Sequence, residues 1–248
     1  MIRLLLLLLA VSLALLWRLP ASLLDQELGK ISNNEIRLAQ AQGSVWAGSG
    51  NVVVFDAVER RWRPWLSLAW HVDAGSLWRG VFGIRLAVEG RPEASVDLSW
   101  REIRISELSF ASPAGLFLAR IPDALGRAGW KGDMSLAVSD WRCDWSWHCD
   151  GHAELTWMGA ASDLFPGRQF GDYRLLADGR QSDVRLGWTT VRGDIHIEGS
   201  GRWQPQSLPD FSATVSGDPA FLERLPSIGG RWVRPGATAG TWLVDFRS

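Results

Sequence analysis

From residue 37 onward, apolar and polar side chains alternate with a period of two, in short segments that end at Gly, Pro or Asp-Gly. In 66–72, for example, Leu68, Trp70 and Val72 are separated by small or polar residues. Such alternation is typical of strands that bury one face. The strands predicted in this way cover 37–41, 51–55, 66–72, 84–89, 94–100, 103–110, 134–138, 152–157, 173–177, 184–188, 194–198, 211–215 and 241–246.

Helical patterns are few and short. They cover 23–30, a proline-interrupted stretch at 114–127, and 218–224, where Asp218 is a good N-cap and Pro219 suits the first helical position. Because no long helix separates the strands, we predict a mainly β protein built as an antiparallel meander, curved as a half-pipe or sandwich-like. We expect one β domain over 25–248, with a possible seam at 113–132.

The N-terminus predicts a membrane anchor. A run from Leu4 to Trp17, interrupted only by Ser12, follows Arg3, and its extension to Leu24 reaches the roughly 20 residues that a bilayer requires. No small-x-small cleavage site follows the run directly, which favours a retained transmembrane helix over 1–24 rather than a cleaved export signal. A buried core helix is the third alternative. The candidate anchor residues are Leu4, Leu9, Leu16 and Trp17, and the bulk of the chain is expected in the periplasm.

Two cysteines lie close together in the segment 143–149. A local disulfide between Cys143 and Cys149, formed in an oxidising compartment, is the simplest interpretation because no second pair completes a thiolate metal site. A metal site that adds His148 and His152 is the alternative. The C-x-x-C spacing of redox motifs is missing.

Charge and motifs argue against several functions. The chain has 26 Lys and Arg against 27 Asp and Glu, so no basic field attracts nucleic acid. Its four histidines lie in none of the usual hydrolase or metal signatures, and Gly199-Ser200-Gly201 lacks the nucleophile elbow. We therefore predict no enzymatic activity, no catalytic or metal-binding residues and no cofactor.

Tryptophan is unusually frequent, with 16 Trp against one Tyr. Several lie between glycines, in 43–48, 75–80 and 129–132, which we interpret as structural corners rather than ligand loops. Large amphipathic rings belong in a core, a groove or an interface. The candidate partner-surface or structural aromatics are Trp46, Trp65, Trp70 and Trp78.

The order of these segments resembles the type II secretion system protein N family, also called general secretion pathway protein N. The resemblance covers about residues 1–225. It is carried by Leu19-Pro20-Ala21, 37–48 with its Gly-Ser-Val-Trp-Ala-Gly end, 65–70, Cys149-Asp150-Gly151, Gly171-Asp172-Tyr173-Arg174 and 192–203.

The resemblance implies an accessory inner-membrane component of the type II secretion system, a non-enzymatic scaffold that supports export of folded proteins. The implied partners are the inner-membrane platform proteins, especially the family's protein C, and the outer-membrane secretin. A periplasmic protein that binds or transfers lipid or another hydrophobic ligand in a β groove is the alternative. Apolar positions that persist on one face through every strand would favour that alternative.

Overall fold

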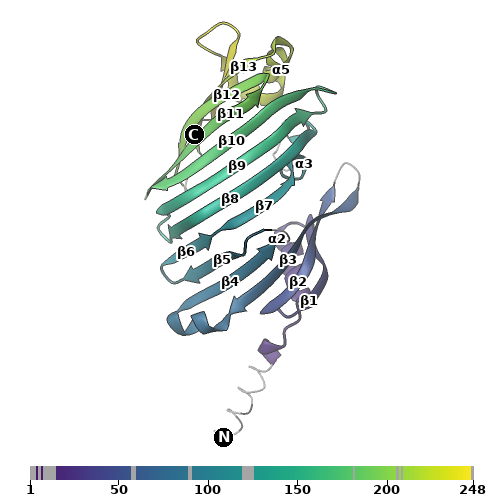
Figure 1. The fold of residues 1–248 in the computed structure, drawn as a ribbon, viewed down its shortest axis with the longest axis vertical. Coiled ribbons are helices and arrows are strands. Elements are labelled where there is room, and N and C mark those ends of the chain that lie inside the picture. Colours follow the sequence, from purple (N-terminus) through teal and green to yellow (C-terminus); the bar gives the residue numbers. More distant parts are fainter. Residues whose placement is uncertain are drawn as a thin grey trace. The chain divides into compact units, whose positions relative to one another are not determined.

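The computed structural model describes residues 4, 7, 15–56, 60–88, 91–118, 126–180, 182–204, 207 and 209–246. The chain forms two compact units, Met1–Asp97 and Leu98–Ser248. Figure 1 shows that strands dominate both. The mainly β, antiparallel fold with few short helices is confirmed, whereas the domain limits and the half-pipe curvature stay predictions.

The first unit is a meander covered by one helix. Strands β1 to β4 pair antiparallel with their chain neighbours, and β5 follows β4 in the sheet order. The helix α2 precedes the sheet, and the 3-10 helix η1 joins β3 to β4. The elements are α2 (Ser22–Ile31), β1 (Ile36–Gly43), β2 (Ala47–Asp56), β3 (Arg61–Asp73), η1 (Ala74–Arg79), β4 (Val81–Val88) and β5 (Ala94–Ser99), which ends just past the unit boundary.

The core of this unit forms where α2 packs on the sheet. Leu24 and Leu28 of α2 contact a cluster that includes the buried Leu38, Val52 and Trp70 of three successive strands. A polar contact fixes the helix, because the Asp25 carboxylate accepts hydrogen bonds from Arg37 Nε at 2.8 Å, Arg37 Nη2 at 2.6 Å and the Leu38 N–H at 2.8 Å.

The second unit contains the longer strands. Its sheet order is β6-β8-β9-β10-β11-β12-β13-β15-β14, and β7 also pairs with β8. The elements are β6 (Glu102–Ser106), β7 (Leu108–Pro113), α3 (Ala114–Leu118), β8 (Trp130–Asp144), β9 (Cys149–Ser162), β10 (Gln169–Arg180), β11 (Asp183–Gly193), β12 (Ile195–Trp203), β13 (Asp210–Gly217), α5 (Pro219–Gly229), η2 (Gly230–Trp232), β14 (Val233–Pro235) and β15 (Thr241–Phe246).

One face of this sheet is apolar from β7 to β15. Directly paired residues point to the same side of a sheet, so the register defines rows of side chains across the strands. One row consists of Phe110, Leu136, Leu155, Leu175, Trp188, Gly199, Ala213 and Val244. The next row, two residues along each strand, consists of Leu108, Val138, Ala153, Ala177, Leu186, Gly201 and Phe211.

The opposite face is mostly polar. A row on that side contains Ser109, Ala137, Glu154, Leu176, Gly187, Ser200, Ser212 and Asp245. The sheet therefore has one solvated face, as antiparallel sheets commonly do.

Two short helices cover part of the apolar face. Phe117 and Leu118 of α3, together with Phe221 and Leu222 of α5, belong to or pack on the core cluster that contains Met134, Trp157, Tyr173 and Ile195. The Tyr173 hydroxyl lies in this core and donates to the Ile195 carbonyl at 3.0 Å. Farther from the helices, Leu136, Ala153, Ala177 and Leu186 are half-buried and lie outside this cluster.

The predicted elements needed few corrections. The strand expected over 103–110 is broken into β6 and β7 at Glu107, whose φ of 54° does not fit a strand. The helix expected over 114–127 ends at Leu118 as α3, and 119–125 lie outside the described residues. The short strand β14 was missed.

The predicted anchor requires correction at its end. Leu9 and most of 1–14 lie outside the described residues, whereas Leu4, Leu16 and Trp17 are described and exposed. A single helix from Leu4 to Leu24 is wrong, because Pro20 pairs with Ser44 and a separate helix, α2, begins at Ser22. In the described part of the chain, no helix combines the length and the apolar character needed to cross a membrane.

The Asp25 contacts predict an acid-sensitive first unit. Hydrogen bonds from Arg37 hold the pKa of Asp25 below its ordinary value of 3.8. The ionised carboxylate therefore stabilises the fold above pH 3.8, and this contribution is lost as the pH falls through the lower folded pKa. Asp25→Asn should lower the free energy of unfolding by about 1–2 kcal/mol at pH 7 and weaken its pH dependence below pH 4.

Denaturant unfolding at pH 7 and pH 3 measures both effects. Glu27→Gln on the same helix is the control, because Glu27 pairs with Lys30 on the exposed surface and its loss should change stability by less than about 0.5 kcal/mol. Equal effects of the two substitutions would contradict the role of Asp25.

Candidate functional site

The N-terminal segment docks on the turn between β1 and β2. The Val45 N–H donates to the Leu19 carbonyl at 3.0 Å, and the Ala21 N–H donates to the Gly43 carbonyl at 3.1 Å. Trp46 Nε1 donates to the Leu16 carbonyl at 2.8 Å. The chain that follows the apolar run is therefore held on this corner of the first unit.

One stacking contact between two tryptophans and one hydrogen bond from a third tryptophan stabilise this corner. Trp17 stacks on Trp46, with ring centroids 6.1 Å apart and an angle of 19° between the rings. Beneath the turn, the buried Trp70 donates from Nε1 to the Ser44 carbonyl at 3.1 Å. A Cβ at Gly48 would lie 2.6 Å from the Trp70 ring, so only glycine fits there.

The second Gly-Trp segment forms the η1 turn. Ser76 is buried, donates from Oγ to the Asp73 carbonyl at 2.6 Å and accepts from the Gly83 N–H at 3.1 Å. These bonds fix a tip on which Trp78 is 95% exposed and Leu77 is 49% exposed. The third segment, 129–132, includes the start of β8, so the three segments occupy different structural positions.

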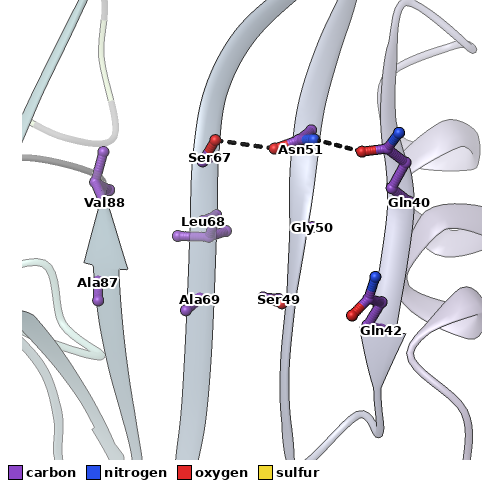
Figure 2. Close-up of a pocket in the computed structure, with 10 residues that line it drawn as sticks. All are labelled: Gln40, Gln42, Ser49, Gly50, Asn51, Ser67, Leu68, Ala69, Ala87 and Val88. Atoms are coloured by element: carbon purple, nitrogen blue, oxygen red, sulfur yellow. Dashed lines mark hydrogen bonds between the residues drawn. The ribbon is translucent and has the colours of Figure 1, made fainter.

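A hollow of about 510 Å³ lies on strands β1 to β4, and Figure 2 shows residues that line it. Asn51 connects its walls, because the side-chain amide donates to Gln40 Oε1 at 2.8 Å and its oxygen accepts from Ser67 Oγ at 2.9 Å. Much of the remaining lining is small or apolar, including Ala69 and Ala87. None of the described residues that line the hollow carries a charge.

An aromatic cluster lies at two neighbouring turns of the second unit. The turn between β8 and β9 carries Trp145 and Trp147, which are 53% and 51% exposed, and the turn after β5 carries Trp100, which is 73% exposed. Trp145 Nε1 donates to the Ser99 carbonyl at 3.2 Å and joins the two turns. The Arg101 guanidinium lies 4.3 Å from the centre of the Trp100 ring. We call Trp100, Trp145 and Trp147 the aromatic cluster.

A disulfide closes the turn that carries Trp145 and Trp147. Cys143 and Cys149 are direct partners in the β8–β9 register and are joined by an S–S bond of 2.10 Å. Inside the loop, the Asp144 carboxylate accepts from the N–H groups of Ser146 and His148, and these bonds lower its pKa. The predicted disulfide is present, and the metal alternative is wrong because both sulfurs are bonded to each other.

The histidine pairs lie apart from one another. His148 Nδ1 is 3.0 Å from Asp144, and His152 Nδ1 is 2.7 Å from Asp178, both on the surface. Across the residues with described positions, no group of three or more His, Cys, Asp or Glu side chains could hold a metal ion.

The segments of the second half that carry the family resemblance have structural roles. The buried Asp172 accepts from the Gly159 N–H at 2.6 Å and pairs with Arg192, and these contacts hold its pKa below the usual range. Gly193 has a φ of 135°, and a Cβ there would lie 2.3 Å from the Phe170 carbonyl oxygen. Asp172 and Gly193 therefore lie at the register shifts where β10 pairs with β9 and β11, and they fix the backbone there.

The aromatics singled out from the sequence are distributed between core and surface. Trp70 is buried, Trp46 and Trp65 are half-buried, and Trp78 is exposed. The aromatic cluster was missed, although its sequence carries a signal: two Trp side chains in a loop too short to bury them, enclosed by a cysteine pair.

These features define an antiparallel β-sheet protein with one apolar and one polar face in its larger unit and with exposed tryptophans on its turns. The chain belongs to the type II secretion system protein N family: the model of the family described as "Type II secretion system (T2SS), protein N" matches residues 34–230. Membership implies involvement in type II secretion. Comparison with curated proteins and with solved structures finds no significant match.

A substitution at Gly193 tests the register shift between β10 and β11 directly. Gly193→Ala should destabilise the protein by about 2 kcal/mol or more, because a Cβ would clash with a backbone oxygen and disfavour the positive φ. Gly187→Ala on the same strand is the control, since nothing lies within 4 Å of the Cβ position there. Denaturant unfolding curves measure both variants, and equal stability of the two would contradict the assignment.

Proposed function

We propose that the protein is a non-enzymatic scaffold of the type II secretion system. It is held at the inner membrane by its apolar N-terminal segment, with most of the chain in the periplasm, where it supports export of folded proteins. Family membership and the run from Leu4 to Trp17 support this proposal. Its partners are platform proteins, chiefly the family's protein C, or the secretin.

The aromatic cluster is the observation that carries the proposal. Exposed Trp side chains are typical anchors of protein interfaces, where a few buried aromatic and Arg residues supply most of the binding energy. Here the disulfide holds the turn and the Trp145–Ser99 hydrogen bond holds the Trp145 ring before binding, which reduces the entropy lost on association. Arg101 beside Trp100 adds a cation that suits an acidic or aromatic partner surface.

Strand addition is the weaker way to bind a partner. The strand β14 at one end of the sheet order covers only Val233–Pro235, and its proline has no N–H to donate. Short edge strands that contain proline resist pairing with other chains. We therefore assign partner binding to the aromatic cluster rather than to this edge.

Trp145→Ala combined with Trp147→Ala tests this assignment in the full chain. Co-purification with protein C or another platform protein should fall at least tenfold, and secretion of exported proteins should fall with it. Trp62→Ala, which removes a 44% exposed Trp from the first unit, should leave both unchanged. The combination of Cys143→Ser with Cys149→Ser should weaken binding less, because it loosens the turn but keeps the rings.

Retention of binding by the double Trp variant would overturn the role of the cluster. Continued secretion in cells that lack the protein, with no association between the protein and any platform or secretin component, would overturn the scaffold proposal itself.

A second candidate function is binding of lipid acyl chains or another hydrophobic ligand on the apolar face of the second unit. The unbroken apolar rows from β7 to β15 favour it, because the helices α3 and α5 cover only part of that face. A bound ligand would cover the apolar surface that the helices leave open.

Native mass spectrometry of the purified full chain tests lipid binding. The wild type should carry lipid, Leu175→Arg on the apolar face should lose it, and Leu176→Arg on the opposite face of the same strand should keep it. Circular dichroism verifies that both variants fold. A wild-type protein free of lipid, or equal lipid in both variants, would contradict this candidate.

A further inference from the structure

The η1 tip and the docked N-terminal segment lie at the same end of the first unit's sheet. Ala47 of β2 pairs with His71 of β3, and the Val72 N–H donates to the Trp46 carbonyl at 2.6 Å. The chain enters η1 two residues after Val72. The tip that carries Trp78 therefore leaves the sheet beside the corner on which Trp17 and the end of the apolar run are held.

The residues at this end share a chemical character. The three segments that meet or leave the sheet here, 15–21, 43–48 and 74–80, contain Arg18 and Arg79 but no acidic residue. Their exposed apolar side chains include Trp17 at 64%, Leu77 at 49% and Trp78 at 95% exposure. Asp73 at the base of the tip is engaged by the Gly75 N–H at 2.9 Å.

This composition matches the interface of a bilayer. Tryptophan rings prefer the depth of the lipid headgroups, and arginine is attracted to anionic lipid. The tip is also rigid, because Ser76 fastens it to β3 and β4 and Gly80 ends it with a φ of 70°. A fixed turn can place Leu77 and Trp78 in the interface without the entropy loss of ordering a loop.

We propose that the η1 tip is a second membrane contact, which inserts Leu77 and Trp78 into the headgroup region of an anionic bilayer while Arg79 binds lipid phosphate. The first unit then stands on the membrane at two points, the N-terminal segment and the tip. This inference rests on the proposed inner-membrane anchor, and it adds a lipid-binding role for residues 77–79.

A fluorescent probe at the tip tests the contact. The described cysteines are joined in a disulfide, so Leu77→Cys introduces a single reactive thiol for an environment-sensitive dye. The labelled full chain is reconstituted in nanodiscs that contain anionic phospholipid and a lipid with a quencher at headgroup depth. Trp62→Cys is the matched control, because Trp62 lies at the opposite end of the same sheet, where Asp56 pairs with Arg61.

The proposal predicts a blue-shifted and quenched dye at position 77 and an unquenched dye at position 62. Adding Arg79→Gln to the probe variant should lower the ratio of inserted to free tip about fivefold, and zwitterionic discs should have a similar effect. Trp78→Ala should reduce quenching in both kinds of disc, because it removes the apolar contribution.

Each other outcome overturns the inference. If the chain co-elutes with the discs but the dye at position 77 is not quenched, the anchor is supported and the tip contact is refuted. Chains that do not co-elute with discs refute the anchor, and the tip contact with it. Equal quenching at both positions indicates non-specific adsorption. Protection of the dye only in membranes that contain secretion components indicates a protein partner instead of lipid.

Discussion

The structure depends on one constraint: the long strands bury mainly one face, so something must cover that face. In the first unit the cover is α2, which Asp25 fixes to β1 through Arg37 and the Leu38 N–H. In the second unit α3 and α5 are too short to cover the rows from β7 to β15. The polar face has no such need, because water solvates it.

This constraint does not explain the exposed tryptophans on the turns. Trp70 and Trp157, which lie inside the sheets, pack into cores, whereas Trp78 and the aromatic cluster are exposed on turns. Both sets are held rigidly, by Ser76 in one unit and by the disulfide in the other. Exposed aromatic side chains on rigid turns are suited to binding, and we propose that those at η1 bind lipid and that those of the aromatic cluster bind protein.

Alternation predicted the strands well because burial of one face imposes a period of two on the sequence. It failed where a backbone feature intervened, as at Glu107, whose positive φ divides β6 from β7. The disulfide was predictable because the two cysteines lie close together and have no second pair that would complete a thiolate metal site. The join between the two Trp-bearing turns was not, because the Trp145–Ser99 contact spans distant sequence positions, and neither was the docking of Leu16 and Leu19 on the β1–β2 turn.

The central claim is that the aromatic cluster binds another component of the secretion machinery. A photo-crosslinking amino acid in place of Trp147, introduced in growing cells that secrete, tests it most directly. The account predicts a crosslink from position 147 to a platform protein or the secretin, with none from Val191, an exposed position elsewhere in the same unit. Crosslinks from both positions, or from neither in cells that contain the protein, would contradict it.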